Sequence, residues 1–145
     1  MSRKIAALIS VSLIALFLFS GVPAANAQEE HMHVEIDIKP GSYPNAINIK
    51  NNGVVPVALF GSAVFDVHQV DLATVRLSRM DDHEGGAPVL LSAFKDVNGD
   101  GFIDLILQFE TQAIGLQPGD TMACLHGMLM NGEHFCGHDS VKVIG

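Results

Sequence analysis

The sequence predicts an all-β protein: an antiparallel β-sandwich of the immunoglobulin type, with one calcium loop between two of its strands. Three observations support this class. Apolar and polar residues alternate at the period of a strand in several short segments, and Gly, Pro, Asn and Asp residues separate these segments regularly. No segment after residue 33 has the longer amphipathic pattern of a helix. About eight short strands with such turns are typical of a sandwich.

The predicted strands follow the apolar segments in order. The first is expected where Val34, Ile36 and Ile38 alternate with Glu35 and Asp37. The others are expected at residues 47–50, 54–60, 75–77, 89–94, 103–109, 121–130, 133–136 and 141–144. Short helical turns are expected only within residues 66–73 and 110–116.

Two sequence features constrain how these strands are arranged. Pro56 has no N–H to donate, so the strand at 54–60 is expected at a sheet edge or with a bulge. Asn131-Gly132 suits a two-residue turn, so the strands on either side are expected to form a hairpin.

Residues 1–27 are predicted to be a signal peptide. Arg3 and Lys4 precede an apolar run from Ile5 to Phe19, and Ala25-Asn26-Ala27 has the small residues of a cleavage site. The run is shorter than the ~20 apolar residues of a membrane-spanning helix. We therefore expect a secreted or periplasmic protein with no membrane span after cleavage.

The rest of the chain divides into a flexible N-terminal tail, residues 28–33, and one domain, residues 34–145. The whole chain has 8 Lys and Arg residues against 16 Asp and Glu residues. Two of those basic residues lie in the predicted signal peptide, so the exported chain would be still more acidic. Such a surface repels phosphate groups, so we expect no nucleic-acid partner.

Residues 96–104, Asp-Val-Asn-Gly-Asp-Gly-Phe-Ile-Asp, have the oxygen spacing of a calcium loop. Gly101 occupies position 6, where the sharp turn needs a residue without a Cβ. The predicted ligands are the side chains at positions 1, 3, 5 and 9 and the carbonyl at position 7, which are Asp96, Asn98, Asp100, Asp104 and Phe102.

The calcium loop differs from a complete EF-hand. Leu107 stands where an EF-hand has a bidentate Glu, and residues 103–109 look like a strand and not like an exiting helix. The loop more closely resembles those of dockerins and of integrin-type repeats. Water or the acidic residues at 81, 82 and 84 could complete the coordination. The alternative is an Asx/Gly turn that binds nothing.

Cys124 and Cys136 predict one disulfide, because an exported chain with an even number of cysteines often forms bridges. An ideal two-residue hairpin would place Cys124 opposite Asp139, so the bridge requires a bulge or another register. The alternative is two buried thiols or a metal-binding pair.

The same C-terminal segment contains a second candidate metal site. Imidazole and thioether groups together suit copper, and imidazole also suits zinc. The predicted soft-metal ligands are His126, Met128, Met130 and His134. The alternative is a Met-rich core face with exposed histidines.

Several motifs, in this order, resemble one family of secreted bacterial β-sandwich domains. They are Ile36-Asp37-Ile38-Lys39-Pro40-Gly41-Ser42, Pro44-Asn45-Ala46-Ile47-Asn48, Gly53-Val54-Val55-Pro56-Val57-Ala58-Leu59, Val70-Asp71, Thr74-Val75-Arg76, Asp96 to Leu105, Gly119-Asp120-Thr121 and Asp139-Ser140-Val141. The resemblance covers residues 34–144. It implies a calcium-associated β-sandwich without known catalytic activity. The chain is richer in His and Met than the family pattern.

The sequence contains no nucleophile elbow, phosphate loop, HExxH motif or dinucleotide fingerprint, so we expect no enzyme. The predicted function is a non-enzymatic, exported calcium-binding module that binds a protein or associates with a surface or matrix. The alternative is an exported copper- or zinc-binding protein that uses the His/Met cluster.

Overall fold

Strands dominate residues 30–145, which are the residues that the computed structural model describes. The predicted signal peptide, residues 1–27, lies outside this range. The strands are β1 (Met32–His33), β2 (Ile36–Ile38), β3 (Ala46–Asn48), β4 (Val54–Leu59), β5 (Val70–Arg79), β6 (Ala87–Lys95), β7 (Asp104–Glu110), β8 (Met122–Leu129), β9 (His134–Ser140) and β10 (Lys142–Ile144). The predicted short turns are the 3-10 helices η4 (Val67–Gln69) and η5 (Thr111–Ile114). The all-β class is confirmed.

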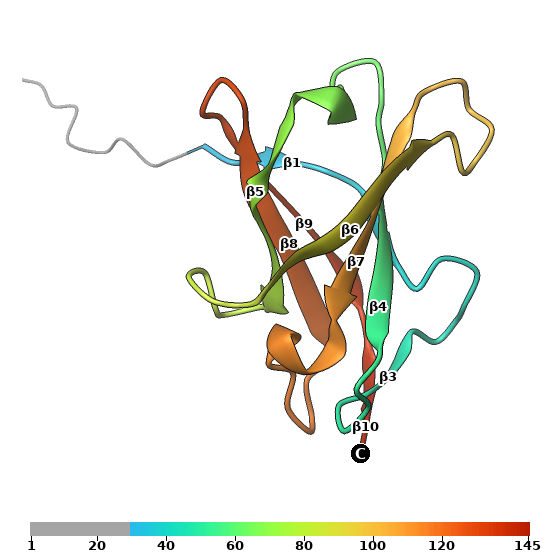
Figure 1. Cartoon of the computed structure of the whole chain (residues 1–145), viewed down its shortest axis with the longest axis vertical. Helices are drawn as coiled ribbons and strands as arrows, with labels where there is room; N and C mark the ends of the chain where they lie inside the picture. The colour runs from blue at the N-terminus through green and yellow to red at the C-terminus, as the bar shows by residue number, and fades with distance from the viewer. Residues whose placement is uncertain (1–29) are drawn as a thin grey trace, which may run out of the picture. The chain divides into compact units, whose positions relative to one another are not determined.

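Within the described range, eight strands form one mixed sheet in the order β1-β9-β8-β5-β6-β7-β4-β2, and β10 pairs with β3. The sheet curls, so that β5, β8 and β9 face β4 and β7, while β6 crosses from one group to the other (Figure 1). The β1–β9 and β3–β10 pairings are parallel. The prediction of a purely antiparallel fold was therefore wrong at both ends of the chain. The pairing gives one curled mixed sheet of eight strands and a separate two-stranded sheet of β3 and β10.

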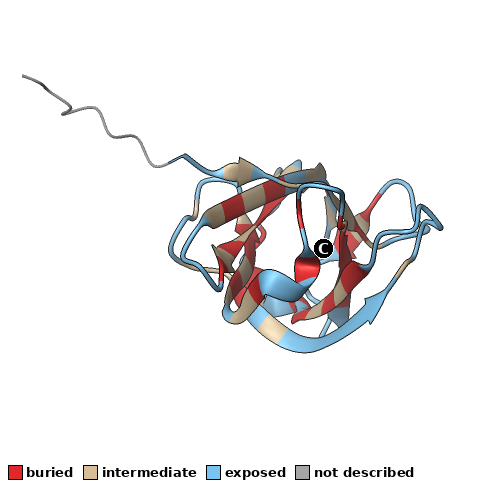
Figure 2. Cartoon of the chain, turned by 90° about the horizontal axis from the view of Figure 1, so that it is seen from above, coloured by how far each residue is buried: buried red, intermediate tan, exposed pale blue. Residues whose placement is uncertain are grey.

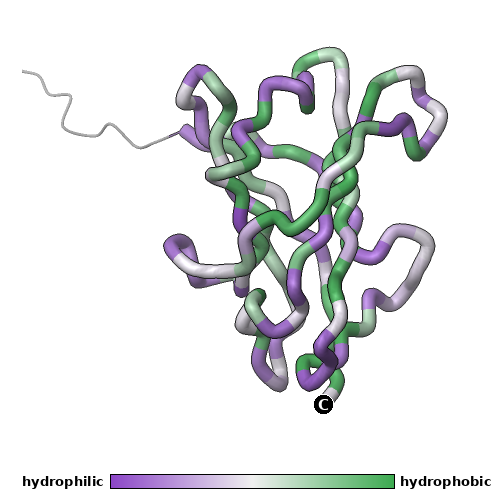
Figure 3. Tube along the Cα trace, in the orientation of Figure 1, coloured by the Kyte–Doolittle hydropathy of each residue, from purple (hydrophilic) through white to green (hydrophobic). Residues whose placement is uncertain are grey.

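The core lies between the two facing groups of strands. Alternate residues of β4, β7, β8 and β9 point inward, and among the largest fully buried side chains are Phe109, Phe135, Leu107 and Leu125. Figure 2 shows that the buried residues lie mainly in the strands other than β6, with exposed residues in the loops. Hydrophobic residues are concentrated in the strands, and hydrophilic residues are concentrated in the loops (Figure 3).

Pro56 lies in an internal strand, contrary to the prediction of an edge or a bulge. β4 pairs with β7 on one side and with β2 on the other. The carbonyl of Pro56 accepts the N–H of Lys39, just beyond the end of β2. The N and C=O of a strand residue face the same neighbouring strand. The nitrogen of Pro56 therefore faces the chain just beyond the end of β2. No ladder hydrogen bond is lost there.

The tail was predicted too long, because Met32 and His33 form β1 and pair in parallel with β9. The β8–β9 hairpin is confirmed, but its turn is longer than predicted. The N–H of Leu129 donates to the carbonyl of Glu133 at 2.8 Å, which leaves three residues in the turn. Gly132 closes it with φ of +90°, which a glycine adopts readily. This extra residue shifts the register of the whole hairpin.

Candidate metal centres

The predicted calcium loop, residues 96–104, joins β6 to β7 at one end of the sheet. Lys95 and Asp104 form the last residue pair of the two strands, and the intervening residues turn the chain. Gly99 and Gly101 have φ of +71° and +90°. Side-chain-bearing residues disfavour these values, so the two glycines explain why the chain can wind so tightly.

The side chain of Asp96 organises the interior of the loop. One carboxylate oxygen accepts the N–H of Gly99, and the other accepts the N–H of Gly101, both at 2.9 Å. These bonds lower the pKa of Asp96, with the N–H of Gly101 as the largest cause. Asp100 also accepts a backbone bond, from Phe102 at 2.9 Å, and Asn98 accepts one from Asp100 at 3.3 Å.

Asp104 ties the loop to the rest of the fold. It is fully buried, and its two oxygens accept the N–H groups of Gly61 and Val97, each at 2.9 Å. Gly61 lies against the carbonyl of Ile103 so closely that a Cβ would overlap it. The loop after β4 and the calcium loop are therefore held together by a buried carboxylate.

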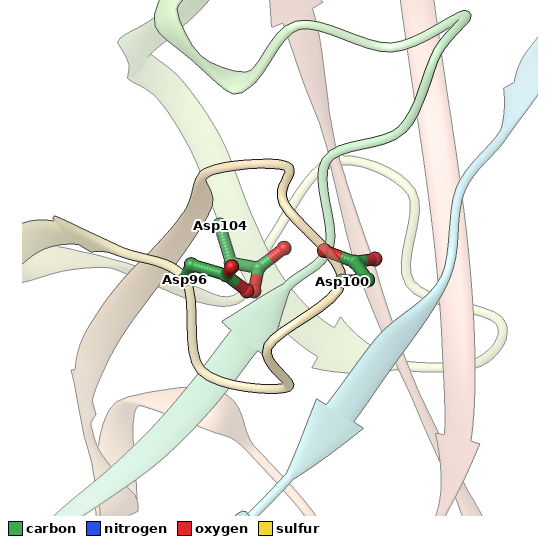
Figure 4. A group of neighbouring side chains, drawn as sticks. All are labelled: Asp96, Asp100 and Asp104. Carbon is green, nitrogen blue, oxygen red and sulfur yellow. The ribbon is translucent and has the colours of Figure 1, made fainter.

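The structure brings the three predicted carboxylates together. Oxygens of Asp96, Asp100 and Asp104 all lie within 4.8 Å of one another. Figure 4 shows Asp96 and Asp104 side by side, with Asp100 facing them across the loop. Three carboxylates at this spacing repel each other, and calcium takes 6–8 oxygen ligands of this type. The arrangement can hold a hard cation.

The acidic residues at 81, 82 and 84 cannot complete this site, contrary to the possibility raised from the sequence. They precede β6, whereas the calcium loop follows it. Nine strand residues place the two loops roughly 25–30 Å apart. Figure 1 shows the loops at opposite ends of β6.

The second candidate site lies on the outer face of β8 and β9. The residues that face outward pair across the two strands as Cys124 with His138, His126 with Cys136, and Met128 with His134. Three of the predicted soft-metal ligands, His126, Met128 and His134, therefore share this face. Met130 stands in the turn beyond them and is 66% exposed, so the structure does not bring it to the cluster.

The cysteines are free, so the predicted disulfide was wrong. The observed register places Cys124 and Cys136 diagonally, in residue pairs that are two apart along the two strands. Diagonal neighbours have Cα atoms about 7–8 Å apart, whereas a disulfide requires about 4.4–6.8 Å. The buried thiol of Cys124 has its pKa raised to about 11, chiefly by burial and further by the charge of Cys136.

His126 has an uncommon environment on this face. Its Nε2 atom is buried and has no hydrogen-bond partner among residues 30–145. Burial is the largest cause that lowers its pKa, followed by the charge of His83 from the β5–β6 loop. Strand β1 brings more imidazole groups to the same face, because His33 pairs with Cys136 and the ring of His31 lies 5.6 Å from that of His134.

The sequence contains one further pattern, which was not among the predicted sites. Cys-x-His occurs at 124–126 and again at 136–138. On adjacent antiparallel strands, two such motifs can place each Cys opposite the His of the other. We call these four residues, Cys124, His126, Cys136 and His138, the Cys/His quadrangle.

Comparison of the chain with protein-family models, with curated proteins and with solved structures finds no match. Among residues 30–145, no helix has the length and hydropathy that crossing a bilayer requires.

Proposed function

We propose that the protein is an exported, non-enzymatic module whose calcium loop takes one structural Ca²⁺ ion. The observation that carries this proposal is the convergence of three carboxylates, from Asp96, Asp100 and Asp104, within 4.8 Å of one another. In this proposal the curled sheet is a sandwich-like scaffold, and the ion holds its β6–β7 end closed.

The loop geometry supports a cation more than a simple turn. Backbone N–H groups hold both oxygens of Asp96 and both of Asp104 in place. Each carboxylate oxygen has a second lone pair, so it can accept one backbone bond and still contact an ion. With Asn98 and the carbonyl of Phe102, the loop offers about five ligand groups, and water would complete the 6–8 oxygens.

The missing bidentate Glu supports a modest affinity, about 10⁻⁴–10⁻³ M as in extracellular calcium modules. That range fits the calcium concentration outside cells and the signal peptide predicted at residues 1–27. The acidic composition, 16 Asp and Glu against 8 Lys and Arg, and the ordered motifs of a secreted family support the same location.

Apolar side chains around the loop support a role in binding a protein, surface or matrix. Val97, Phe102 and Ile103 are 40%, 43% and 41% exposed, and Val64 in the adjacent loop is 85% exposed. Exposed apolar groups next to one another are typical of contact surfaces. Ion binding would fix the loop that presents three of them.

Thermal unfolding with and without calcium tests the proposal. At a calcium concentration ~100 times the dissociation constant, binding adds about 2.7 kcal/mol to stability. This should raise the melting temperature by roughly 10 °C. Magnesium should raise it little, because Mg²⁺ requires a smaller octahedral site and retains its waters. Asp100→Ala should abolish the calcium-dependent rise.

Asp81→Ala is the matched control. Asp81 is also an exposed aspartate, but it precedes β6 and lies far from the calcium loop. The control variant should keep the full calcium-dependent rise. Equal melting curves in calcium and in chelator, with no calcium binding by calorimetry, would show that the loop is a turn only.

A further inference from the structure

We propose that the Cys/His quadrangle on the outer face of β8 and β9 is a second metal site, for one thiophilic ion such as Zn²⁺ or Cu(I). The ligands would be the two thiolates of Cys124 and Cys136 and one nitrogen from each of His126 and His138. This site is independent of the calcium loop and takes a different class of ion.

The pairing of the strands carries the proposal. Cys124 is opposite His138, and His126 is opposite Cys136. Opposite residues lie about 4.5–5.5 Å apart, and alternate residues of one strand lie about 6.6–6.8 Å apart. Four potential ligands therefore occupy the corners of a small rectangle on one face, with Cys and His alternating around it. Two sulfurs and two nitrogens suit a tetrahedral ion.

The spacing of the thiols favours a metal over a disulfide. Bonded cysteines need Cβ atoms about 3.5–4.5 Å apart, and a diagonal pair is wider than this. A metal ion with two bonds of about 2.3 Å to sulfur lets the sulfurs stay almost twice as far apart as in a disulfide. The same register that prevents the bridge therefore fits a shared ion.

The surroundings of His126 also favour a ligand role. Its Nε2 atom is buried without a hydrogen-bond partner among the described residues, although buried imidazole nitrogens usually have one. A metal would satisfy this nitrogen after rotation of the side chains toward the centre of the rectangle.

Burial and charge balance fit a divalent ion well. Cys124 is 8% exposed, whereas His138 is exposed at the rim, so the site is open to solvent on one side. Two thiolates neutralise the charge of Zn²⁺, and a neutral complex avoids burying a net charge. Because both thiols must lose a proton, binding should release protons and weaken as the pH falls.

Titration of the reduced chain with Co²⁺, Zn²⁺ and Cu(I) in the absence of oxygen tests the site. We expect one ion per chain and, for Co²⁺, thiolate-to-metal charge-transfer absorption with the intense bands of tetrahedral cobalt. Zn²⁺ should displace Co²⁺. Cys136→Ser and His138→Ala should each weaken binding by more than the roughly 10–100-fold typical of outer-shell changes. Both positions are partly or fully exposed, so both variants should fold.

His134→Ala is the matched control, because His134 is on the same face of β9 but pairs with Met128, outside the quadrangle. It should bind as the unchanged chain does, and so should Asp100→Ala, which separates this site from the calcium loop. The proposal fails if Co²⁺ shows no thiolate absorption or if Cys136→Ser binds with unchanged affinity. It also fails if His134→Ala weakens binding as much as His138→Ala, since the ligands would then be surface histidines.

Discussion

The calcium loop and the Cys/His quadrangle are both candidate metal centres, but the fold assembles them in opposite ways. The predicted calcium loop would take all its protein ligands from nine consecutive residues, and backbone bonds hold the carboxylates in place. The quadrangle takes two ligands from each of two strands, and only the β8–β9 register brings them together. One centre depends on local turn geometry, and the other depends on strand pairing.

This difference also separates the chemistry of the two centres. Carboxylates and carbonyls are hard ligands that suit Ca²⁺, whereas thiolates and imidazoles suit Zn²⁺ and Cu(I). In the described residues, the ligand atoms of the Asp group already lie within 4.8 Å of one another, whereas the quadrangle requires side-chain rotation. The carboxylates of the predicted calcium loop therefore need less side-chain movement to reach one ion than the ligands of the Cys/His quadrangle do. Three further experiments can sharpen the comparison.

The largest expected effect is that of Asp104→Ala in the absence of calcium. Asp104 is fully buried and accepts bonds from Gly61 and Val97. Hydrogen bonds to a charged group contribute about 1.5–3 kcal/mol each, so the variant, which removes two of them, should lose about 3–6 kcal/mol. Asp100→Ala removes an exposed carboxylate with one backbone bond and should lose much less. Urea unfolding in chelator would measure both losses, and similar values would mean that Asp104 has no special structural role.

The next effect concerns the pH dependence of stability through Cys124. Its pKa is raised from 9.0 to about 11 in the folded protein, so folding favours the protonated thiol. The contribution of Cys124 is fully present below pH 9 and is lost as the pH rises from 9 to 11. One pKa unit corresponds to about 1.4 kcal/mol, so the loss is at most about 3 kcal/mol.

Denaturant unfolding of the metal-free protein between pH 8 and 11 measures this loss. Cys124→Ala should show a smaller decline than the unchanged chain, because it lacks the titrating group. The raised pKa also makes the thiolate of Cys124 about 100-fold scarcer at pH 8 than an ordinary thiolate, so its alkylation should be slow. Unfolded, unreduced protein should expose two reactive thiols, and fewer would indicate a disulfide.

The smallest effect is that of Gly101→Ala in the calcium loop. A Cβ at Gly101 would meet no atom within 4 Å, so the cost comes from the backbone φ of +90° alone. That cost is about 1–2 kcal/mol. Gly119→Ala is the control, because Gly119 has φ of +93° and equally open surroundings but lies in another turn. Both variants should lose similar stability in chelator, and only Gly101→Ala should also reduce the calcium-dependent rise in melting temperature.

The elements that were predicted well depend on neighbours in the sequence. Strands β4, β6, β7 and β8 lie where alternation and apolar runs placed them, and the turns at η4 and η5 were also expected. Pro56 was placed wrongly at an edge, because the end of β2 beside it depends on a distant segment. The parallel pairings of β1 and β10 join segments far apart in the chain, and no local pattern marks them.

The sequence by itself determined the all-β class and the candidate calcium ligands, since strand periodicity and the spacing from Asp96 to Asp104 are both local. It also contained both Cys-x-His motifs, but their spacing along the chain says nothing about which residues face each other. Tertiary structure decided that point through one extra turn residue, which places Cys124 opposite His138 and not opposite Asp139. Because side chains alternate between the faces of a strand, this shift of one residue decides which groups share the outer face.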